Sequence, residues 1–226
     1  MDEELRELEA SRLPREFYVR DHVEVARALL GKVLWHASDE GLAAVRIVET
    51  EAYGGSDDPG SHAFRGMTRR NAVMFGPPGY LYVYFTYGMH FCLNVVTGSE
   101  GTASAVLVRA GEPLFGIELM RRRRRIDDTA RLACGPGNLC RALGISREHN
   151  GADLCSGLVG VSSPSNLAFG LSSPVPGAHG EAKFPELVAT KRVGLSRDGG
   201  QEWRFFLKDS ACVSGPRPRS RAQRSS

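Results

Sequence analysis

Two short stretches that meet at a glycine constrain the fold more than any other feature. Residues 80–87 and 91–96 are rich in tyrosine, phenylalanine and valine, and Gly88 lies between them. Aromatic and β-branched residues favour strands, and a glycine in a tight connection favours a hairpin. The sequence therefore predicts two antiparallel strands joined by a turn at residues 87–90.

Strand and helix patterns interleave irregularly along the rest of the chain. Further strands are predicted at 32–36, 42–53, 104–109, 191–195 and 203–207, and helices at 21–30, 112–125 and 136–143. Residues 21–24 have the pattern of a capping box, and Gly31 and Gly144 can end the helices that precede them. The sequence has no internal repeat and no clear domain boundary, so it predicts a single mixed α+β domain.

The two ends of the chain differ in charge. The first residues are acidic, and the last residues are basic and rich in serine and proline. We predict a disordered acidic N-terminus at 1–12, a folded domain at 13–213 and a flexible basic tail at 214–226. A stretch rich in serine, proline and glycine at 162–180 is predicted to be a long surface loop or partly disordered.

The composition is that of an ordinary globular protein. The formal net charge of +3 permits a polyanionic partner without requiring one. No apolar stretch approaches membrane-spanning length, and acidic residues follow Met1 where a signal peptide would be basic. Five cysteines without a C-x-x-C pair argue against a disulfide framework and against structural zinc. We therefore expect a protein that is neither secreted nor in a membrane and that works in a reducing compartment.

Glu49 and Glu51 alternate on one predicted strand whose preceding residues are apolar. Val45, Ile47 and Tyr53 are expected on the same face as these two acids. If that face points inward, one carboxyl group is desolvated and suited to proton transfer; otherwise both are solvated at an exposed strand end. Two close carboxylates would also suit an O-glycosidase, but that alternative gives the nearby tyrosines no function.

Several side chains have both a structural and a functional interpretation. Tyr80 and Tyr82 are most simply packing residues of the hairpin. Tyr87 is expected at the hairpin tip, where it is well placed to enter another molecule, such as the gap between stacked bases. His62 lies in a loop and is by default a surface residue, whereas Asn94 lies within a strand and needs hydrogen-bond partners or a ligand.

Basic residues occur in two clusters. Arginines 121–125 lie on a predicted helix and therefore point in all directions, so some would be solvated or salt-bridged and others would contact phosphates. Arg65, Arg69 and Arg70 form a second basic cluster in a loop. Arg109 ends an apolar strand, where a cation commonly pairs with a carboxylate.

These residues together resemble the alkyladenine (3-methyladenine) DNA glycosylase family. The resemblance depends on RIVETEAY at 46–53, His62, Asn71 with Met74 and Phe75, GYLYVYFTYGMHFCLNVV at 79–96, LVRAGEP at 107–113, CGPGNLC at 134–140 and RVG at 192–194. The motifs follow one another in fixed order within residues 13–213. They leave only the two ends of the chain outside the resemblance.

The resemblance implies both a fold and an activity. The fold would be a curved, mainly antiparallel β-sheet with peripheral helices and a protruding β-hairpin. The activity would be that of a DNA repair glycosylase, which flips 3-methyladenine, 7-methylguanine, hypoxanthine or ethenoadenine out of duplex DNA and hydrolyses the N-glycosidic bond to leave an abasic site. The enzyme would be monofunctional, without lyase activity, cofactor or metal. It would act as a monomer on double-stranded DNA, in the cytoplasm or nucleoid of a bacterium or in the nucleus of a eukaryote.

The resemblance also implies how water would be activated. Glu51 would be the general base, Arg109 would help to hold the water and the phosphate of the target nucleotide, and the carbonyl of Val193 would be a third partner of the water. No lysine lies near Glu51 in these motifs, so a Schiff-base step is not expected. A lesion-binding protein without activity is the alternative, and the presence of Glu51 argues against it.

The remaining candidates would bind the base or replace it. By resemblance Tyr53, Tyr84 and His62 would form the slot that holds the flipped base. Tyr87 would fill the gap that the base leaves in the stack, and Asn94 would crowd the exocyclic amino group of normal guanine. A purine alkylated at N3 or N7 is cationic, so tyrosine faces would attract it by about 0.5–2 kcal/mol.

Overall fold

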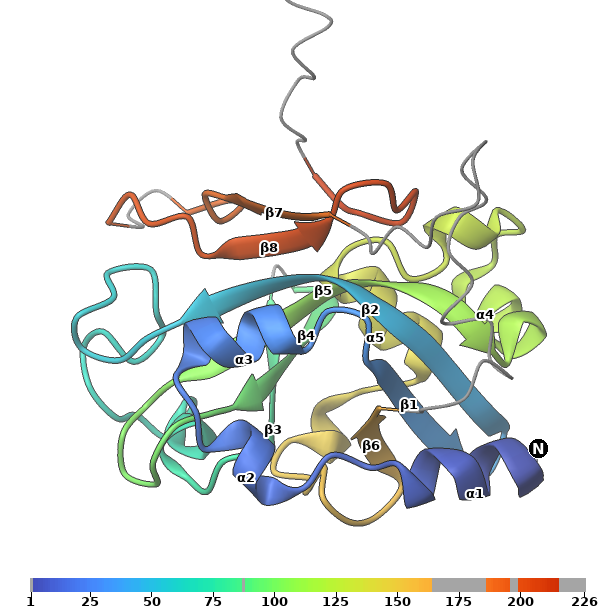
Figure 1. Ribbon diagram of the computed structural model, residues 1–226, viewed down its shortest axis with the longest axis horizontal. Helices are drawn as coiled ribbons and strands as arrows, with labels where there is room; N and C mark the ends of the chain where they lie inside the picture. Colours follow the sequence, from blue (N-terminus) through green and yellow to red (C-terminus); the bar gives the residue numbers. More distant parts are fainter. Residues whose placement is uncertain (1, 87, 164–185, 196–198, 216–226) are drawn as a thin grey trace, which may run out of the picture.

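Eight strands form one curled, antiparallel half-barrel sheet in the computed structural model, which describes residues 2–86, 88–163, 186–195 and 199–215 (Figure 1). They are β1 (Val33–Ser38), β2 (Gly41–Tyr53), β3 (Leu81–Thr86), β4 (His90–Val96), β5 (Ala105–Phe115), β6 (Val159–Ser162), β7 (Leu187–Thr190) and β8 (Arg204–Leu207). The order along the sheet is β3-β4-β5-β2-β1-β6, and β8 pairs with β2 and β7. The predicted fold class is confirmed.

Most of the helices pack on the sheet through the largest hydrophobic core, and the first one packs through a separate cluster. The helices are α1 (Asp2–Ala10), α2 (Arg15–Tyr18), α3 (His22–Ala28), α4 (Ile117–Arg124) and α5 (Pro136–Leu143), with 3₁₀ turns η1 (Ala72–Phe75), η2 (Thr129–Arg131) and η3 (Arg147–His149). The Asp21 side chain caps α3 by accepting a hydrogen bond from the Val23 N–H at 2.8 Å. Pro136 opens α5, and Gly144 ends it with a φ of +71°. The predicted starts and ends of these two helices are therefore close to the observed ones.

The predicted hairpin is confirmed as the pair β3 and β4. Tyr82 lies opposite Asn94, and Tyr84 lies opposite Cys92. These four residues alternate with the apolar residues of the two strands, so they share the other face of the hairpin. Tyr87 lies outside the residues that the structure describes, and its role as a wedge stays a prediction.

The helix predicted at 112–125 begins later than expected. Strand β5 continues to Phe115, and α4 starts only after Gly116, which has a φ of +71°. Pro113 is therefore a strand residue. It lies beside a register shift between β2 and β5, where the missing N–H of a proline is tolerated.

Two further predictions about strands need correction. The strand predicted at 191–195 is wrong, because β7 ends at Thr190 and the following residues form a loop. Strand β6 was not predicted. It has only four residues and is held by pairing with β1, from Val33↔Ser162 to His36↔Val159.

The N-terminus differs from the predicted disordered segment. Residues 2–10 form α1, and its Leu8 is fully buried in a cluster with Val33, Trp35 and Leu42. This contact orders a segment whose composition alone suggests disorder. The chain from 216 onward and most of the 162–180 stretch lie outside the described residues.

Two β-bulges decide which side chains of β2 face the main core. One leaves Val48 as an extra residue of β2, and the next leaves Arg109 as an extra residue of β5. Ile47 lies in the main core before the bulge and Ala52 lies there after it, so the alternation changes phase. Glu51 therefore faces away from that core, and the prediction that all odd-numbered residues of 45–53 share one face is wrong.

Candidate active site

Glu51 is fully buried near the end of β2 and is held by three hydrogen-bond donors. Its Oε2 accepts from the Tyr53 hydroxyl at 2.8 Å and from Arg109 Nη1 at 3.2 Å. Its Oε1 accepts from the backbone N–H of Val193 at 2.7 Å. Donors on both oxygens fix the orientation of the carboxylate, which still has lone pairs for one more donor such as water.

Arg109 connects Glu51 to the second acid of the predicted pair. Its Nε donates to Glu49 Oε1 at 2.8 Å, and its Nη2 donates to Ser214 Oγ at 3.2 Å. The bulge at Arg109 turns the side chain out of the regular alternation and toward both carboxylates. Although burial opposes the charged form, the charges of Glu51 and Glu49 raise the pKa of Arg109.

Glu49 is the structural partner in this network. It accepts from Arg204 Nε at 2.7 Å and from the Ser214 N–H at 2.7 Å, in addition to its contact with Arg109. Two carboxylates and two guanidinium groups are thus buried together, so their charges balance. This pairing leaves Glu51 as the acid that faces the neighbouring aromatic cavity through Tyr53.

Four of the predicted base-binding residues line one cavity. Its lining consists of Tyr53, Gly60, His62, Met74, Tyr82, Tyr84, Asn94 and Leu195. The rings of His62 and Tyr84 meet edge to face with centroids 4.5 Å apart. Because the Tyr53 hydroxyl bonds to Glu51, this cavity adjoins the buried carboxylate. The arrangement places flat aromatic surfaces next to Glu51, the candidate general base.

The cavity is lined by neutral rings. Burial and the charge of Glu51 raise the pKa of Tyr53, so its phenol stays protonated and donates to the carboxylate. Burial, together with the nearby charge of Arg70, lowers the pKa of His62. Asn94 donates from Nδ2 to the Tyr82 carbonyl at 3.0 Å, which leaves its own oxygen available toward the cavity.

The loop that carries His62 is fixed by a buried amide. Asn71 Nδ2 donates to the carbonyls of His62 and Gly66 at 2.8 and 3.1 Å. Asn71 Oδ1 accepts from the Thr68 N–H at 2.6 Å. Arg70, from the predicted basic loop, lies over the Tyr84 ring at 5.6 Å. The loop residues of the sequence motif therefore come together around the cavity wall.

A buried ion pair that sequence reasoning missed supports the same site. Arg192 binds Asp58 in a bidentate manner, with distances of 2.6 and 2.7 Å, and neither side chain is exposed. Arg192 Nη1 also donates to the Ala52 carbonyl at 3.0 Å, and its guanidinium lies 4.7 Å from the Tyr53 ring centroid. The pair anchors the loop after β7 so that the next residue, Val193, reaches Glu51. Both residues lie in loops; Arg192 belongs to the RVG motif at 192–194, whereas no pattern in the sequence marked Asp58 as its partner.

The remaining predictions concern the Val193 carbonyl, the cysteines, metal ions and the membrane. Val193 contacts Glu51 through its N–H, so the predicted role of its carbonyl stays a prediction. The five cysteines are free thiols. Among the residues that the structure describes, no group of three His, Cys, Asp or Glu side chains is arranged to hold a metal ion, and no helix is long and apolar enough to cross a membrane.

Comparisons with known proteins agree with the resemblance. Residues 16–211 match the family model of methylpurine-DNA glycosylase. A protein of Methanoculleus marisnigri named "Putative 3-methyladenine DNA glycosylase" is 48% identical over 202 residues, which cover 89% of this chain and 98% of that protein. Proteins with the same name from Streptomyces avermitilis and Frankia casuarinae are 47% and 48% identical, over 89% and 90% of this chain and 90% and 92% of their own lengths.

Proposed function

The chain belongs to the methylpurine-DNA glycosylase family, and we propose that it rotates alkylated or deaminated purines out of duplex DNA and hydrolyses their N-glycosidic bonds. The observation that carries this proposal is the fully buried Glu51, which three donors orient beside an aromatic cavity. The proposed substrates are 3-methyladenine, 7-methylguanine, hypoxanthine and ethenoadenine. Their bases would enter the cavity lined by Tyr53, His62 and Tyr84.

In the proposed reaction Glu51 acts as the general base. The water oxygen forms a bond to C1′ of the deoxyribose, one proton of the water passes to Glu51, and the electrons of the C1′–N bond leave with the purine. Arg109 bridges both buried acids and would hold the water and the phosphate of the target nucleotide. The Val193 carbonyl would be a further partner of the water.

The cavity supplies selectivity for damaged bases. A purine alkylated at N3 or N7 carries a positive charge, which makes it a better leaving group and strengthens its attraction to aromatic faces by about 0.5–2 kcal/mol. Burial lowers the pKa of His62, so a neutral imidazole meets the cationic base without repulsion. Asn94 lines the same cavity, where it would crowd the exocyclic amino group of normal guanine.

We propose that the enzyme is monofunctional. A lyase step requires an amine nucleophile, usually a lysine, that forms a Schiff base with C1′. Within the described residues, the groups that contact the Glu51 carboxylate are Tyr53, Arg109 and Val193, none of which is an amine. Water is then the nucleophile, and the product is an intact abasic site.

Base release from defined duplexes tests the function. Purified protein is incubated with duplex DNA that carries one hypoxanthine, ethenoadenine or 7-methylguanine, and free base is measured by chromatography. We expect release by the unmutated protein and a loss of about 10²–10⁴-fold in Glu51→Gln, because the general base is removed while the shape is kept. Tight binding without release by the unmutated protein would instead identify a lesion-binding protein. Unchanged release by Glu51→Gln would overturn the assigned base.

We further propose that the protein acts as a monomer on chromosomal DNA, in the nucleoid of a bacterium or the nucleus of a eukaryote. Glu51 and the residues that line the aromatic cavity all belong to a single chain. Light scattering of the protein with and without duplex DNA tests the monomer. A stable dimer in both conditions would contradict it.

A further inference from the structure

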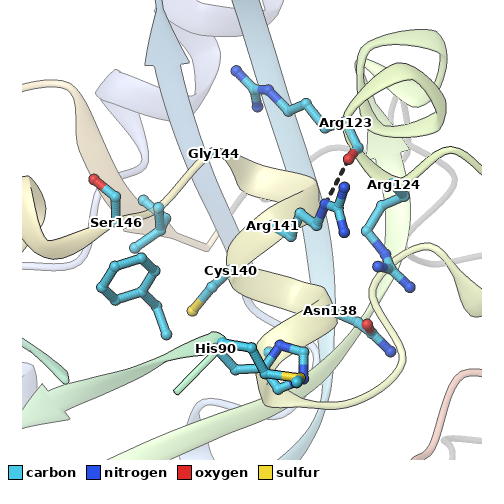
Figure 2. A pocket seen from close by; sticks show the side chains of 12 residues that line it. His90, Arg123, Arg124, Asn138, Cys140, Arg141, Gly144 and Ser146 are labelled. Atoms are coloured by element: carbon cyan, nitrogen blue, oxygen red, sulfur yellow. Dashed lines mark hydrogen bonds between the residues drawn. The ribbon is translucent and has the colours of Figure 1, made fainter. Parts of the chain in front are cut away.

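A second, larger cavity lies beside the turn of the β3–β4 hairpin, between that turn and helices α4 and α5 (Figure 2). Its volume is about 560 Å³. The hairpin contributes Met89, His90 and Phe91, and the rest of the lining comes from the end of α4, from α5 and from the residues just after it. None of its lining residues belongs to the aromatic cavity beside Glu51.

Two of the three arginines in this cavity have no acidic partner. Arg123 pairs with Glu40 at 2.6 Å. Arg124 and Arg141 each use Nε to donate to a backbone carbonyl, that of Leu132 at 2.8 Å and that of Arg123 at 2.7 Å. No carboxylate of the described residues lies within ion-pair distance of either guanidinium, so their terminal N–H groups are free for a ligand. Figure 2 shows both side chains on the same side of the cavity, near Asn138.

The electrostatics of Arg124 agree with an unneutralised cluster. Burial and the positive charges of Arg141 and Arg131 lower the pKa of Arg124. Burial is the largest cause of this shift, and the two neighbouring guanidinium groups add to it. An anion that entered the cavity would relieve this repulsion and would find guanidinium forks, which suit phosphate oxygens.

The cavity is built at a fixed place relative to the hairpin. A Cβ at Gly137 of α5 would come within 2.9 Å of the His90 ring in β4, so the helix and the hairpin approach as closely as only glycine allows. A Cβ at Gly144 would come within 2.7 Å of the Arg123 guanidinium, whose position Glu40 fixes. The free arginines therefore keep a constant distance from the hairpin turn.

We propose that Arg124 and Arg141 bind a backbone phosphate of duplex DNA in this cavity, next to the place where the hairpin meets the duplex. This inference rests on the proposed function and on the predicted entry of Tyr87, at the hairpin turn, into the base stack of the duplex. Duplex DNA carries one phosphate charge for about every 1.7 Å of its axis, so a hairpin that touches the duplex always has phosphates beside it. The contact sets the register of the protein on the duplex and does not read its sequence.

The salt dependence of DNA binding tests this site separately from catalysis. Affinity for an undamaged duplex is measured by fluorescence anisotropy between 50 and 200 mM salt for the unmutated protein and for Arg124→Gln, Arg141→Gln and the double variant. Arg122→Gln is the matched control, because Arg122 is an exposed residue of the same helix and does not line the cavity. The loss of one phosphate contact should reduce the slope of log K against log salt concentration by about 0.9. When the salt concentration rises from 50 to 200 mM, the factor by which affinity falls should therefore be about 3.5 times smaller for the double variant than for the unmutated protein.

Two sets of results would overturn the site. One is a double variant whose affinity and slope equal those of Arg122→Gln. The other is a pair of charge-keeping variants, Arg124→Lys and Arg141→Lys, that bind as weakly as the glutamine variants, because the effect would then come from altered packing. Restored binding by the lysine variants supports the phosphate contact. The binding measurement uses an undamaged duplex, from which no base is released. Its result therefore does not depend on catalysis, and a failure to release damaged bases would contradict the proposed function alone.

Discussion

The contacts of Glu51 show how single residues prepare one carboxylate for chemistry. Tyr53, Arg109 and Val193 occupy both of its oxygens, whereas the equally buried Glu49 is surrounded by Arg109, Arg204 and Ser214. Both acids lie on the same strand and are only two positions apart in the sequence. The difference in their partners makes Glu51 the candidate base and Glu49 the residue that holds Arg109.

The Tyr53 hydroxyl has a testable effect at the residue scale. Tyr53→Phe keeps the ring and removes the 2.8 Å hydrogen bond to Glu51. A hydrogen bond to a charged group contributes about 1.5–3 kcal/mol, so single-turnover base release should slow by about 10- to 100-fold. Affinity for damaged DNA should change little, because the ring face remains. Tyr80→Phe is the control, since Tyr80 does not contact Glu51, and equal rates for the two variants would contradict the assigned role.

His36 gives a prediction about pH and stability. It is buried, and Nδ1 lies 2.8 Å from the Leu143 carbonyl while Nε2 lies 3.3 Å from His149 Nε2. Burial lowers the pKa of His36 below its ordinary value of 6.5; the hydrogen bond to the Leu143 carbonyl and the charge of Glu40 oppose this shift, and the charges of His149 and Arg123 add to it. The unfolded chain therefore binds this proton at a higher pH than the folded chain does.

The depressed pKa of His36 should make the folded protein less stable as the pH falls below 6.5. Above pH 6.5 His36 is neutral in both states and contributes nothing, and as the pH falls below 6.5 the unfolded state gains a proton that the folded state refuses. The free energy of unfolding should decrease until the pH reaches the lower folded pKa, and then level off. Urea unfolding between pH 7.5 and 5 should show a smaller decrease for His36→Gln than for the unmutated protein. A control, His90→Gln, replaces an exposed histidine and should keep the full decrease.

At the scale of elements, the two bulges between β2 and β5 position the site. Without the extra Val48, the alternation of β2 would turn Glu51 into the apolar core beside Ile47. Without the extra Arg109, β5 would not direct a guanidinium toward both acids. Irregular pairing thus places charged groups next to a regular hydrophobic core.

The Asp58–Arg192 pair joins two loops and should affect both stability and activity. Asp58→Asn removes the buried negative charge that balances the Arg192 guanidinium, and breaking an ion pair buried this deeply costs about 3–5 kcal/mol. The loop that presents Val193 to Glu51 loses its anchor, so base release should slow as well. Urea unfolding and single-turnover kinetics measure the two effects. Asp57→Asn is the control at an exposed neighbour, and the pair has no such role if both variants behave alike.

At the scale of the whole molecule, the sheet joins regions that are far apart in sequence into one site. Strand β2 lies between β5 on one side and β1 and β8 on the other, so it meets the hairpin side of the sheet and the C-terminal strands together (Figure 1). Helix α1 packs on β1 and not on the residues around Glu51. A substitution in the contact between α1 and β1 should therefore change the free energy of unfolding without changing the reaction at the candidate site.

Leu8 tests this separation. Leu8→Ala creates a cavity next to Val33 and Trp35 and should lower the free energy of unfolding by about 2–5 kcal/mol. Base release by the folded protein should keep its rate, since α1 does not contact the candidate site. Glu9→Ala, at an exposed neighbour, should change neither quantity. A slower reaction by folded Leu8→Ala would show that the two parts of the molecule are coupled.

Patterns of adjacent residues predicted those features of the fold whose cause is local. The β3–β4 hairpin follows from its aromatic strands and Gly88, and the ends of α5 follow from Pro136 and Gly144, because each depends on a few adjacent residues. Four lining residues of the aromatic cavity, Tyr53, His62, Tyr84 and Asn94, were also singled out from the sequence by the family resemblance, whereas Gly60 and Leu195 were not and Tyr82 was assigned to packing.

Features that depend on a partner far away in the sequence could not be predicted from such patterns. The phase change of β2 at Val48 requires the register of β5, and the order of α1 requires the cluster that receives Leu8. The Asp58–Arg192 pair joins residues that are 134 positions apart. The hydrophobic periodicity of the sequence indicates on which face of its own helix or strand a residue lies. Bulges, long-range ion pairs and buried helix faces depend instead on the free energy of contacts that form only when the elements pack together.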